Sequence, residues 1–153
     1  MSAEQPAVTR KGRLSAALGD DLSFLLARAN AYSLAAGNAA LATIGLRARS
    51  YSVLALAADG SRPSQRDLAD FLRLDPSQVV ALVDDLQTRG LVAREADPAD
   101  RRTNVVIATA AGRVLYEQAR AEAQRAEEQV FARLAPRERE QLASLLQLVA
   151  FPD

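Results

Sequence analysis

The sequence predicts a mainly α-helical fold of the α+β class, with one small β-hairpin set between its helices. Long stretches on both sides of the centre carry apolar residues at helical spacing. Two short segments in the middle each begin with a helix-starting residue, and an alternating β-type run follows them. With 153 residues, of which 49% are hydrophobic, the chain can bury the core of one domain.

The composition excludes most catalytic and metal-binding chemistry. The chain has no cysteine and no histidine, so thiolate nucleophiles, imidazole bases and the usual zinc ligand sets are absent. We therefore expect no enzyme activity, no catalytic residue, no metal site and no cofactor. No segment approaches the roughly 18 consecutive apolar residues of a membrane span, so we expect a cytoplasmic protein without membrane contact. The formal net charge is zero, so nucleic-acid binding would depend on local arrangement of charge.

Residues 1–13 are expected to form a flexible arm, because they lack an apolar periodicity. The basic residues Arg10, Lys11 and Arg13 could touch a polyanion, but a solvated tail is the favoured interpretation. From residue 14 to residue 45, apolar and small residues recur in steps of three and four. This pattern predicts a long helix with a packing stripe, ended by Gly45.

Residues 46–109 are predicted to form a separate lobe. A helix is expected over SYSVLALAAD, with a turn at the following Asp-Gly. The next helix starts with Ser64 as its N-cap and Asp67 in place of the glutamate of a capping box. Asp75 and Pro76 repeat the start signal for another helix, which should run to Thr88 or Arg89 and stop at Gly90.

The second of these short helices has an apolar face and a small polar face. Its spacing turns Val79, Leu82, Val83 and Leu86 inward and leaves Ser77, Gln78, Ala81 and Asp85 outside. Two short helices of this kind predict a helix-turn-helix. The runs LVAREA and TNVVIAT then flank DPADRR as the strands and loop of an antiparallel hairpin. A helix-turn-helix followed directly by a hairpin predicts a winged helix-turn-helix.

Residues 110–153 are predicted to form C-terminal helices. The segment EQARAEAQRAEEQ has almost no large apolar residue, which indicates a solvated connector. Pro136 starts a last helix, whose apolar face contains Leu142, Leu145, Leu146 and Val149. Apolar helices at both ends of a small lobe cannot all bury their faces on it. We therefore expect residues 14–45 and 110–153 to pack against a second copy, giving a homodimer.

Taken together, GLRARSYSVLALAADG and SQRDLADFLRLDPSQVVALVDDLQTRGLVAREADPADRRTNVVIATAAG, with the flanking helices, resemble the MarR family of bacterial winged-helix transcription regulators. The resemblance covers about residues 14–150 and is most specific over 68–112. It implies a homodimer that binds a pseudo-palindromic double-stranded DNA, with recognition helix 76–88 in the major groove and wing 92–109 in the minor groove. We expect repression of transcription, although the sequence leaves activation open.

The resemblance and the side-chain chemistry together suggest three groups of DNA contacts. Base readout is assigned to Ser77, Gln78 and Ala81. The minor-groove group comprises Asp100, Arg101 and Arg102, with Arg102 in the groove, Asp100 orienting it or the turn, and Arg101 near phosphate. The phosphate contacts are assigned to Ser64, Gln65, Arg73, Arg89 and Arg94. For each arginine of the last group, ordinary solvation is the alternative.

The family also implies a small anionic or phenolic effector bound between the dimerisation helices and the lobe. The candidates for that site are Arg28, Tyr32, Arg47 and Tyr51, with interface packing or solvation as the competing interpretation for each.

Two residues depart from the family pattern. Asp85 stands where relatives often have a basic or longer polar residue, and an acid there would repel a nearby phosphate. Arg47 stands where a threonine often caps the second helix. Zero net charge and Asp85 leave a second hypothesis, a winged-helix module that binds a protein and does not touch DNA.

Overall fold

The computed structural model describes residue 12 and residues 17–152. It confirms a mainly helical fold with a small antiparallel sheet. Most of the predicted arm lies outside the described residues. In chain order the elements are α2 (Leu22–Ala42), α3 (Ala48–Ala58), α4 (Gln65–Leu72), α5 (Pro76–Thr88), β1 (Val92–Ala96), β2 (Asn104–Ala108), α6 (Ala110–Val130) and α7 (Pro136–Ala150).

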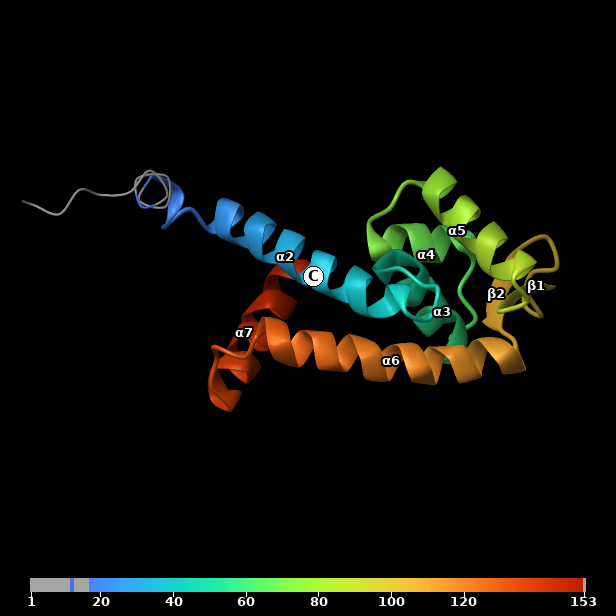
Figure 1. Ribbon diagram of the computed structural model, residues 1–153. Helices are drawn as coiled ribbons and strands as arrows, with labels where there is room; N and C mark the ends of the chain where they lie inside the picture. Colours follow the sequence, from blue (N-terminus) through green and yellow to red (C-terminus); the bar gives the residue numbers. More distant parts are fainter. Residues whose placement is uncertain (1–11, 13–16, 153) are drawn as a thin grey trace, which may run out of the picture.

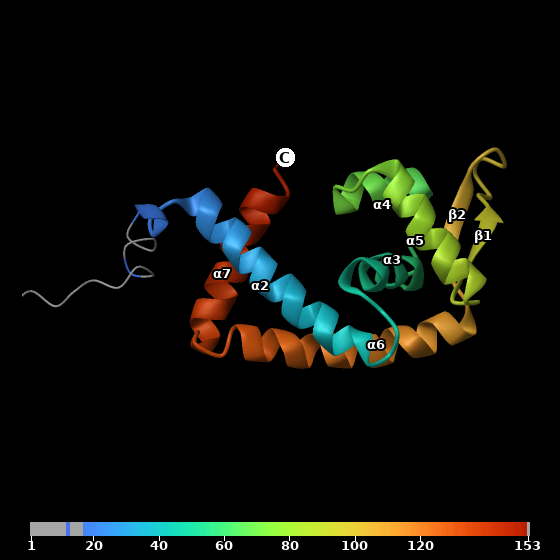
Figure 2. The same ribbon diagram turned by 45° about the horizontal axis from the view of Figure 1, so that its top comes forward.

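Helices α2 and α6 run side by side and carry the lobe at one end of the pair (Figures 1 and 2). The lobe contains α3, α4, α5 and the hairpin, and α3 lies between the helix pair and the rest of it. At the other end, α7 turns back from α6 toward α2 (Figure 2). The helices at the two ends of the chain therefore lie on the same side of the molecule, away from the wing.

Helix α2 begins at Leu22, later than the expected start near residue 14. Residues 19 and 20 form a turn, and Asp21 then acts as the N-cap. Its Oδ1 accepts a hydrogen bond from the Phe24 N–H at 2.7 Å. The apolar periodicity continues across this turn, so it did not reveal the interruption. A carboxylate at an N-cap satisfies a free N–H and favours a new helix start.

The end of α2 confirms the predicted role of Gly45. The Leu46 N–H donates to the Leu41 carbonyl at 3.0 Å, and the Gly45 N–H donates to the Ala42 carbonyl at 3.1 Å. Gly45 has a φ of +71°, which a residue with a Cβ adopts only with strain. This pair of hydrogen bonds is a Schellman motif, and the buried side chains of Leu41 and Leu46 provide its hydrophobic contact.

The start signals of α4 and α5 are confirmed. The Ser64 Oγ accepts from the Asp67 N–H at 3.1 Å, while Asp67 Oδ2 accepts from the Ser64 N–H at 2.8 Å. Hydrogen bonds from the Ser64 side chain and backbone also lower the pKa of Asp67. Asp75 occupies the N-cap position of α5 without a side-chain hydrogen bond, and Pro76 is the first helical residue.

The lobe encloses the core. On α5, Val79, Val83 and Leu86 are fully buried, and Leu82 is half-buried, so the predicted inward face is confirmed. Other fully buried side chains come from α2, α3, α4 and the hairpin, and include Leu41, Val53, Leu54, Leu68, Val92 and Val106. Because this core lies inside the lobe, the outer face of α5 is left to solvent.

The hairpin is anchored on the segment before α4. Strands β1 and β2 pair from Val92 opposite Ala108 to Ala96 opposite Asn104. The Val106 N–H donates to the Pro63 carbonyl at 2.8 Å, and Ser64 forms a bridge with Val105. The wing, defined as β1, β2 and the turn 97–103, is therefore joined to the start of the helix-turn-helix.

Helix α6 is more than the solvated connector that its composition indicated. Its buried residues are Gly112, Ala119 and Ala126, all small, and it packs along α2. Small residues allow two helices to approach closely, so few large side chains are needed. Helix α7 differs, since none of its residues is buried. Its apolar face is open to solvent, with Leu148 75% exposed and Val149 67% exposed.

Candidate nucleic-acid interface

The three residues predicted for base readout lie together on the exposed face of α5. Ser77, Gln78 and Ala81 are all exposed, because Val79 and Val83 turn the opposite face into the core. A surface pocket next to the start of α5 is lined in part by Gln78 and by Arg73, which is one of the predicted phosphate contacts. It also includes Arg49 of α3, which the sequence analysis missed because no local motif links α3 to the α4–α5 turn.

Asp100 organises the turn of the wing. Its Oδ1 accepts from the Arg102 N–H at 3.0 Å, and its Oδ2 accepts from the Thr103 hydroxyl at 3.1 Å. The Thr103 N–H also donates to the Asp100 carbonyl at 2.9 Å. Of the two orienting roles expected for Asp100, these bonds support the one toward the turn backbone. The exposed Arg102 guanidinium is left to project from a fixed turn.

One hollow joins the wing to the start of α4. The residues that line it are Ser64, Gln65, Arg66, Arg94, Arg102, Thr103, Asn104 and Val106. It thus brings Arg102 together with three of the predicted phosphate contacts. Arg66 was missed, although its place in the first turn of a helix was a usable signal, since that is where helices bind anions.

Arg94 connects the elements around this hollow. Its Nε and Nη2 donate to Gln65 Oε1 at 2.9 and 2.6 Å, linking β1 to α4. Its Nη1 donates to Gln87 Oε1 at 2.7 Å, and Nη2 also donates to Asp84 Oδ1 at 2.5 Å, linking β1 to α5. The Arg94 side chain is only 23% exposed. Its guanidinium is therefore largely engaged inside the lobe, while a phosphate contact by Arg94 stays a prediction.

The charges of the lobe are balanced in number but not in arrangement. Residues 46–109 contain nine arginines and nine acidic residues. Asp85, the acid expected to repel phosphate, lies 3.4 Å from Arg89 Nη1, so its charge is partly met within α5. Within residues 12 and 17–152, no carboxylate pairs with Arg73, Arg101 or Arg102. Cationic side chains on the wing thus remain available to an anion, whereas Arg73, beside Gln78, shares its surface pocket with Asp70 and Asp75.

The four predicted ligand residues lie in different surroundings. Tyr51 is half-buried and stacks on Tyr116, with ring centroids 6.0 Å apart and planes at 20°. Burial, and then the nearby Tyr116, raise the pKa of Tyr51. On α2, Arg28 is exposed and Tyr32 is 66% exposed, while Arg47 lines a separate hollow at the α2–α3 junction. Tyr116 was missed because it is distant in sequence.

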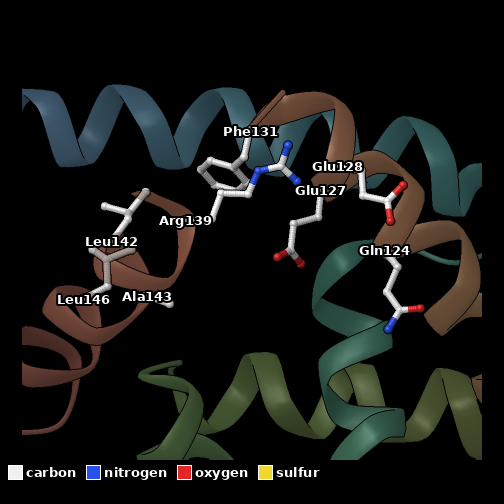
Figure 3. A pocket seen from close by; sticks show the side chains of 8 residues that line it. All are labelled: Gln124, Glu127, Glu128, Phe131, Arg139, Leu142, Ala143 and Leu146. Carbon is white, nitrogen blue, oxygen red and sulfur yellow. The ribbon is translucent and has the colours of Figure 1, made fainter. Parts of the chain in front are cut away.

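Another hollow lies where α6 meets α7, and none of the predicted ligand residues lines it (Figure 3). Phe131, Leu142 and Leu146 supply its apolar wall, and Glu127 and Arg139 are among its charged residues. The apolar wall continues onto the exposed face of α7. The hollow and the exposed apolar face of α7 therefore form one continuous apolar surface.

Residues 12 and 17–152 contain no group of three or more histidine, cysteine, aspartate or glutamate residues that could hold a metal ion. In the same residues, no helix is both long and apolar enough to cross a membrane.

A family model described as MarR family matches residues 44–103. This match spans most of the lobe, from the end of α2 to the turn of the wing. None of the curated proteins matches the chain.

Solved structures match nearly the whole chain. A MarR-family transcriptional regulator from Rhodococcus sp. RHA1 is 44% identical, with a TM-score of 0.84 over 89% of this chain and 96% of that one. CouR from Rhodococcus jostii RHA1, bound to p-coumaroyl-CoA, is also 44% identical, with a TM-score of 0.81 and the same coverage. BpsR of Bordetella bronchiseptica, whose DNA binding is regulated by 6-hydroxynicotinic acid, is 29% identical, with a TM-score of 0.79 over 88% of this chain and 96% of that one.

Proposed function

Since this chain belongs to the MarR family of transcriptional regulators, we propose that it binds a pseudo-palindromic DNA duplex as a homodimer and represses transcription. In this proposal a small ligand modulates the affinity for DNA. The observation that carries it is the shared hollow of the wing and α4, in which Arg102 lies with Ser64, Gln65 and Arg94. Hydrogen-bond donors at the start of a helix can bind a DNA phosphate, and an arginine on a thin hairpin can enter the adjacent minor groove.

The proposed contacts divide by what they recognise. Ser77, Gln78 and Ala81 face outward at the start of α5, which suits a helix that enters a major groove. A glutamine can bond to both N6 and N7 of adenine, so Gln78 is the main candidate for base discrimination. The side chains of the wing and of α4 would provide register and affinity, which depend on phosphate and groove shape more than on sequence.

Replacing Arg102 with alanine tests the wing. We expect the affinity for the preferred duplex to fall by roughly tenfold to a hundredfold, because one well-placed arginine contact contributes about 1–3 kcal/mol. Loss of a cationic contact should also reduce the slope of log affinity against log salt by about one. Fluorescence anisotropy over a range of salt concentrations measures both quantities.

Arg101→Ala is the matched control, since it removes the neighbouring exposed arginine of the same turn. Its effect should be several times smaller, because Arg101 is assigned to a phosphate and not to the groove. If Arg102→Ala binds as tightly as the wild type at every salt concentration, the wing does not contact DNA.

The homodimer is supported by the open apolar faces of the terminal helices. Leu22 and Tyr32 of α2 are 81% and 66% exposed, and Leu148 of α7 is 75% exposed. Apolar side chains gathered at one end of a soluble chain indicate a protein interface. Two lobes related by a two-fold axis would contact half-sites about one helical turn, roughly 10 base pairs, apart.

Leu148→Lys should weaken the dimer. A lysine that is buried in the interface without a partner costs several kcal/mol, so the protein is expected to shift toward a monomer at micromolar concentration. Light scattering after size-exclusion chromatography measures the mass. Gln141→Lys, which adds the same charge at an exposed polar position of α7, should leave the mass unchanged. A Leu148→Lys protein that stays fully dimeric would place the interface elsewhere.

The effector is proposed to be an aromatic molecule with a hydroxyl group and a negative charge. The ligands named with CouR and BpsR both contain a hydroxylated aromatic ring and an acidic group. Tyr51 and Tyr116 offer stacked rings for the aromatic part, and Arg28 or Arg47 could pair with the anion.

Addition of p-coumaroyl-CoA is expected to release the protein from its DNA, with free coenzyme A as the control that lacks the phenolic group. Competition anisotropy measures the release. Equal release by both compounds would show that the phenolic ring is not recognised. If neither compound releases the protein, p-coumaroyl-CoA is not an effector.

A further inference from the structure

The first turn of α3 is capped by a residue of another helix. Asn38, half-buried near the C-terminal end of α2, accepts a hydrogen bond from the Ala48 N–H through Oδ1 at 2.8 Å. Arg47 occupies the N-cap position and makes no side-chain cap hydrogen bond. The arginine that departs from the expected threonine is thus accompanied by a substitute acceptor on the dimerisation helix. This acceptor ties the two helices together, which a cap within α3 would not do.

The hydrogen bond lies at the only covalent junction between α2 and the lobe. The five residues between α2 and α3 are held at one side by the Schellman motif, with Leu41 and Leu46 buried. Helix α3 leads into the lobe core through Val53 and Leu54, both fully buried. The direction of α3 therefore helps to set where the lobe points relative to α2, together with α6, which packs on both α2 and α3.

We propose that Asn38 is a positioning residue that fixes the lobe on the dimerisation helix and thereby sets the separation of the two DNA-contacting helices. The inference rests on the proposed function, because it concerns the geometry of the dimer on DNA. The wing lies at the far end of the lobe from α2 (Figure 2). A small rotation at the junction would therefore move the wing, which carries Arg102, by a much larger distance. Half-site spacing is a geometric property of such dimers, so a looser junction should relax it.

The test compares four variants at Asn38 and Arg47. Asn38→Leu removes the acceptor while keeping a side chain of similar size, and Asn38→Asp keeps the acceptor. The double variant Asn38→Leu with Arg47→Thr provides a cap within α3 but no link to α2. Arg47→Thr alone reports the effect of the threonine itself. Each protein is examined for its melting temperature and for its affinity for duplexes with half-sites spaced from 8 to 12 base pairs, a range of roughly one helical turn.

We expect Asn38→Leu to have a lower melting temperature and an affinity about fivefold or more weaker for the duplex with the preferred half-site spacing. Its affinity should also vary less among duplexes of different spacing. Asn38→Asp should resemble the wild type in both measurements. The double variant should recover the melting temperature but not the spacing preference. If the threonine restores both, or if Asn38→Leu keeps the wild-type spacing preference, Asn38 only caps α3 and the proposal is wrong.

A measurement without DNA separates this inference from the proposed function. The chain has no native cysteine, so Ser23→Cys on α2 and Thr88→Cys at the end of α5 provide unique sites for two spin labels. Labelled chains are diluted with unlabelled ones so that distances within one chain dominate. We expect a narrow distance distribution that broadens with Asn38→Leu and stays broad in the double variant. An unchanged distribution would overturn the positioning role even if DNA binding is confirmed.

Discussion

Arg94→Ala is expected to lower the affinity for DNA by roughly a hundredfold and the free energy of unfolding by about 2 kcal/mol. The side chain donates to Gln65, Gln87 and Asp84, so its loss removes the side-chain hydrogen bonds between β1 and both helices of the helix-turn-helix. Arg94 is only 23% exposed and its partner Gln65 is half-buried, so Gln65 regains water incompletely, whereas the exposed Gln87 and Asp84 regain it. The effect on DNA should lie at the upper end of the range expected for Arg102→Ala, since both the wing and the start of α4 lose a side-chain link.

Urea denaturation and fluorescence anisotropy measure the two effects of Arg94→Ala. Arg66→Ala is the control for stability, because the Arg66–Asp70 pair is separated by 3.9 Å and its side chains are 90% and 76% exposed. That change should stay within about 0.5 kcal/mol. Arg94→Lys should fall between alanine and the wild type, since an ammonium group cannot reproduce the planar fork of a guanidinium. An Arg94→Ala protein with wild-type stability and DNA affinity would show that the network is incidental.

Gly112→Ala is expected to lower the free energy of unfolding by about 3 kcal/mol or more. A Cβ at this position would lie 1.9 Å from the Leu91 carbonyl oxygen and 2.9 Å from its carbonyl carbon. These are backbone atoms at the start of the hairpin, and the Thr109 N–H donates to the same oxygen at 3.0 Å. Helix α6 would have to move away from the lobe to relieve the overlap.

The matched control for Gly112→Ala is Gly37→Ala in α2, where an added Cβ would meet no atom within 4 Å. Alanine usually stabilises a helix by about 1 kcal/mol relative to glycine, so Gly37→Ala should raise stability or leave it unchanged. Thermal and urea denaturation of both variants provide the comparison. Equal and favourable effects at the two positions would contradict the close approach of α6 to Leu91.

The elements of the lobe were predictable because their signals are local. A capping box at Ser64 and Asp67, a proline at the start of α5, and a polar turn between two β-type runs each act within a few residues. The same is true of Asp100, whose partners Arg102 and Thr103 are its neighbours in sequence. Such short-range hydrogen bonds do not depend on the rest of the fold, so the sequence reports them directly.

The features that the sequence did not predict depend on tertiary contacts. The hydrogen bond between Arg94 and Gln65 was not predicted, because Gln65 lies 29 positions earlier in the chain. Asn38 caps a helix that starts ten residues later, and Tyr51 stacks on Tyr116 from another element. The buried residues of α6 are one glycine and two alanines, which have no strong apolar signature. In each case the chain must already be folded before the partners meet.

The central claim is that this chain recognises a specific DNA duplex as a dimer. Selection of bound sequences from a pool of random duplexes, with the purified wild-type protein, tests that claim most directly. We predict enrichment of a pseudo-palindrome whose half-sites are centred about 10 base pairs apart. A pool that remains random after repeated selection at low salt would contradict the claim and favour a winged-helix module that binds a protein partner.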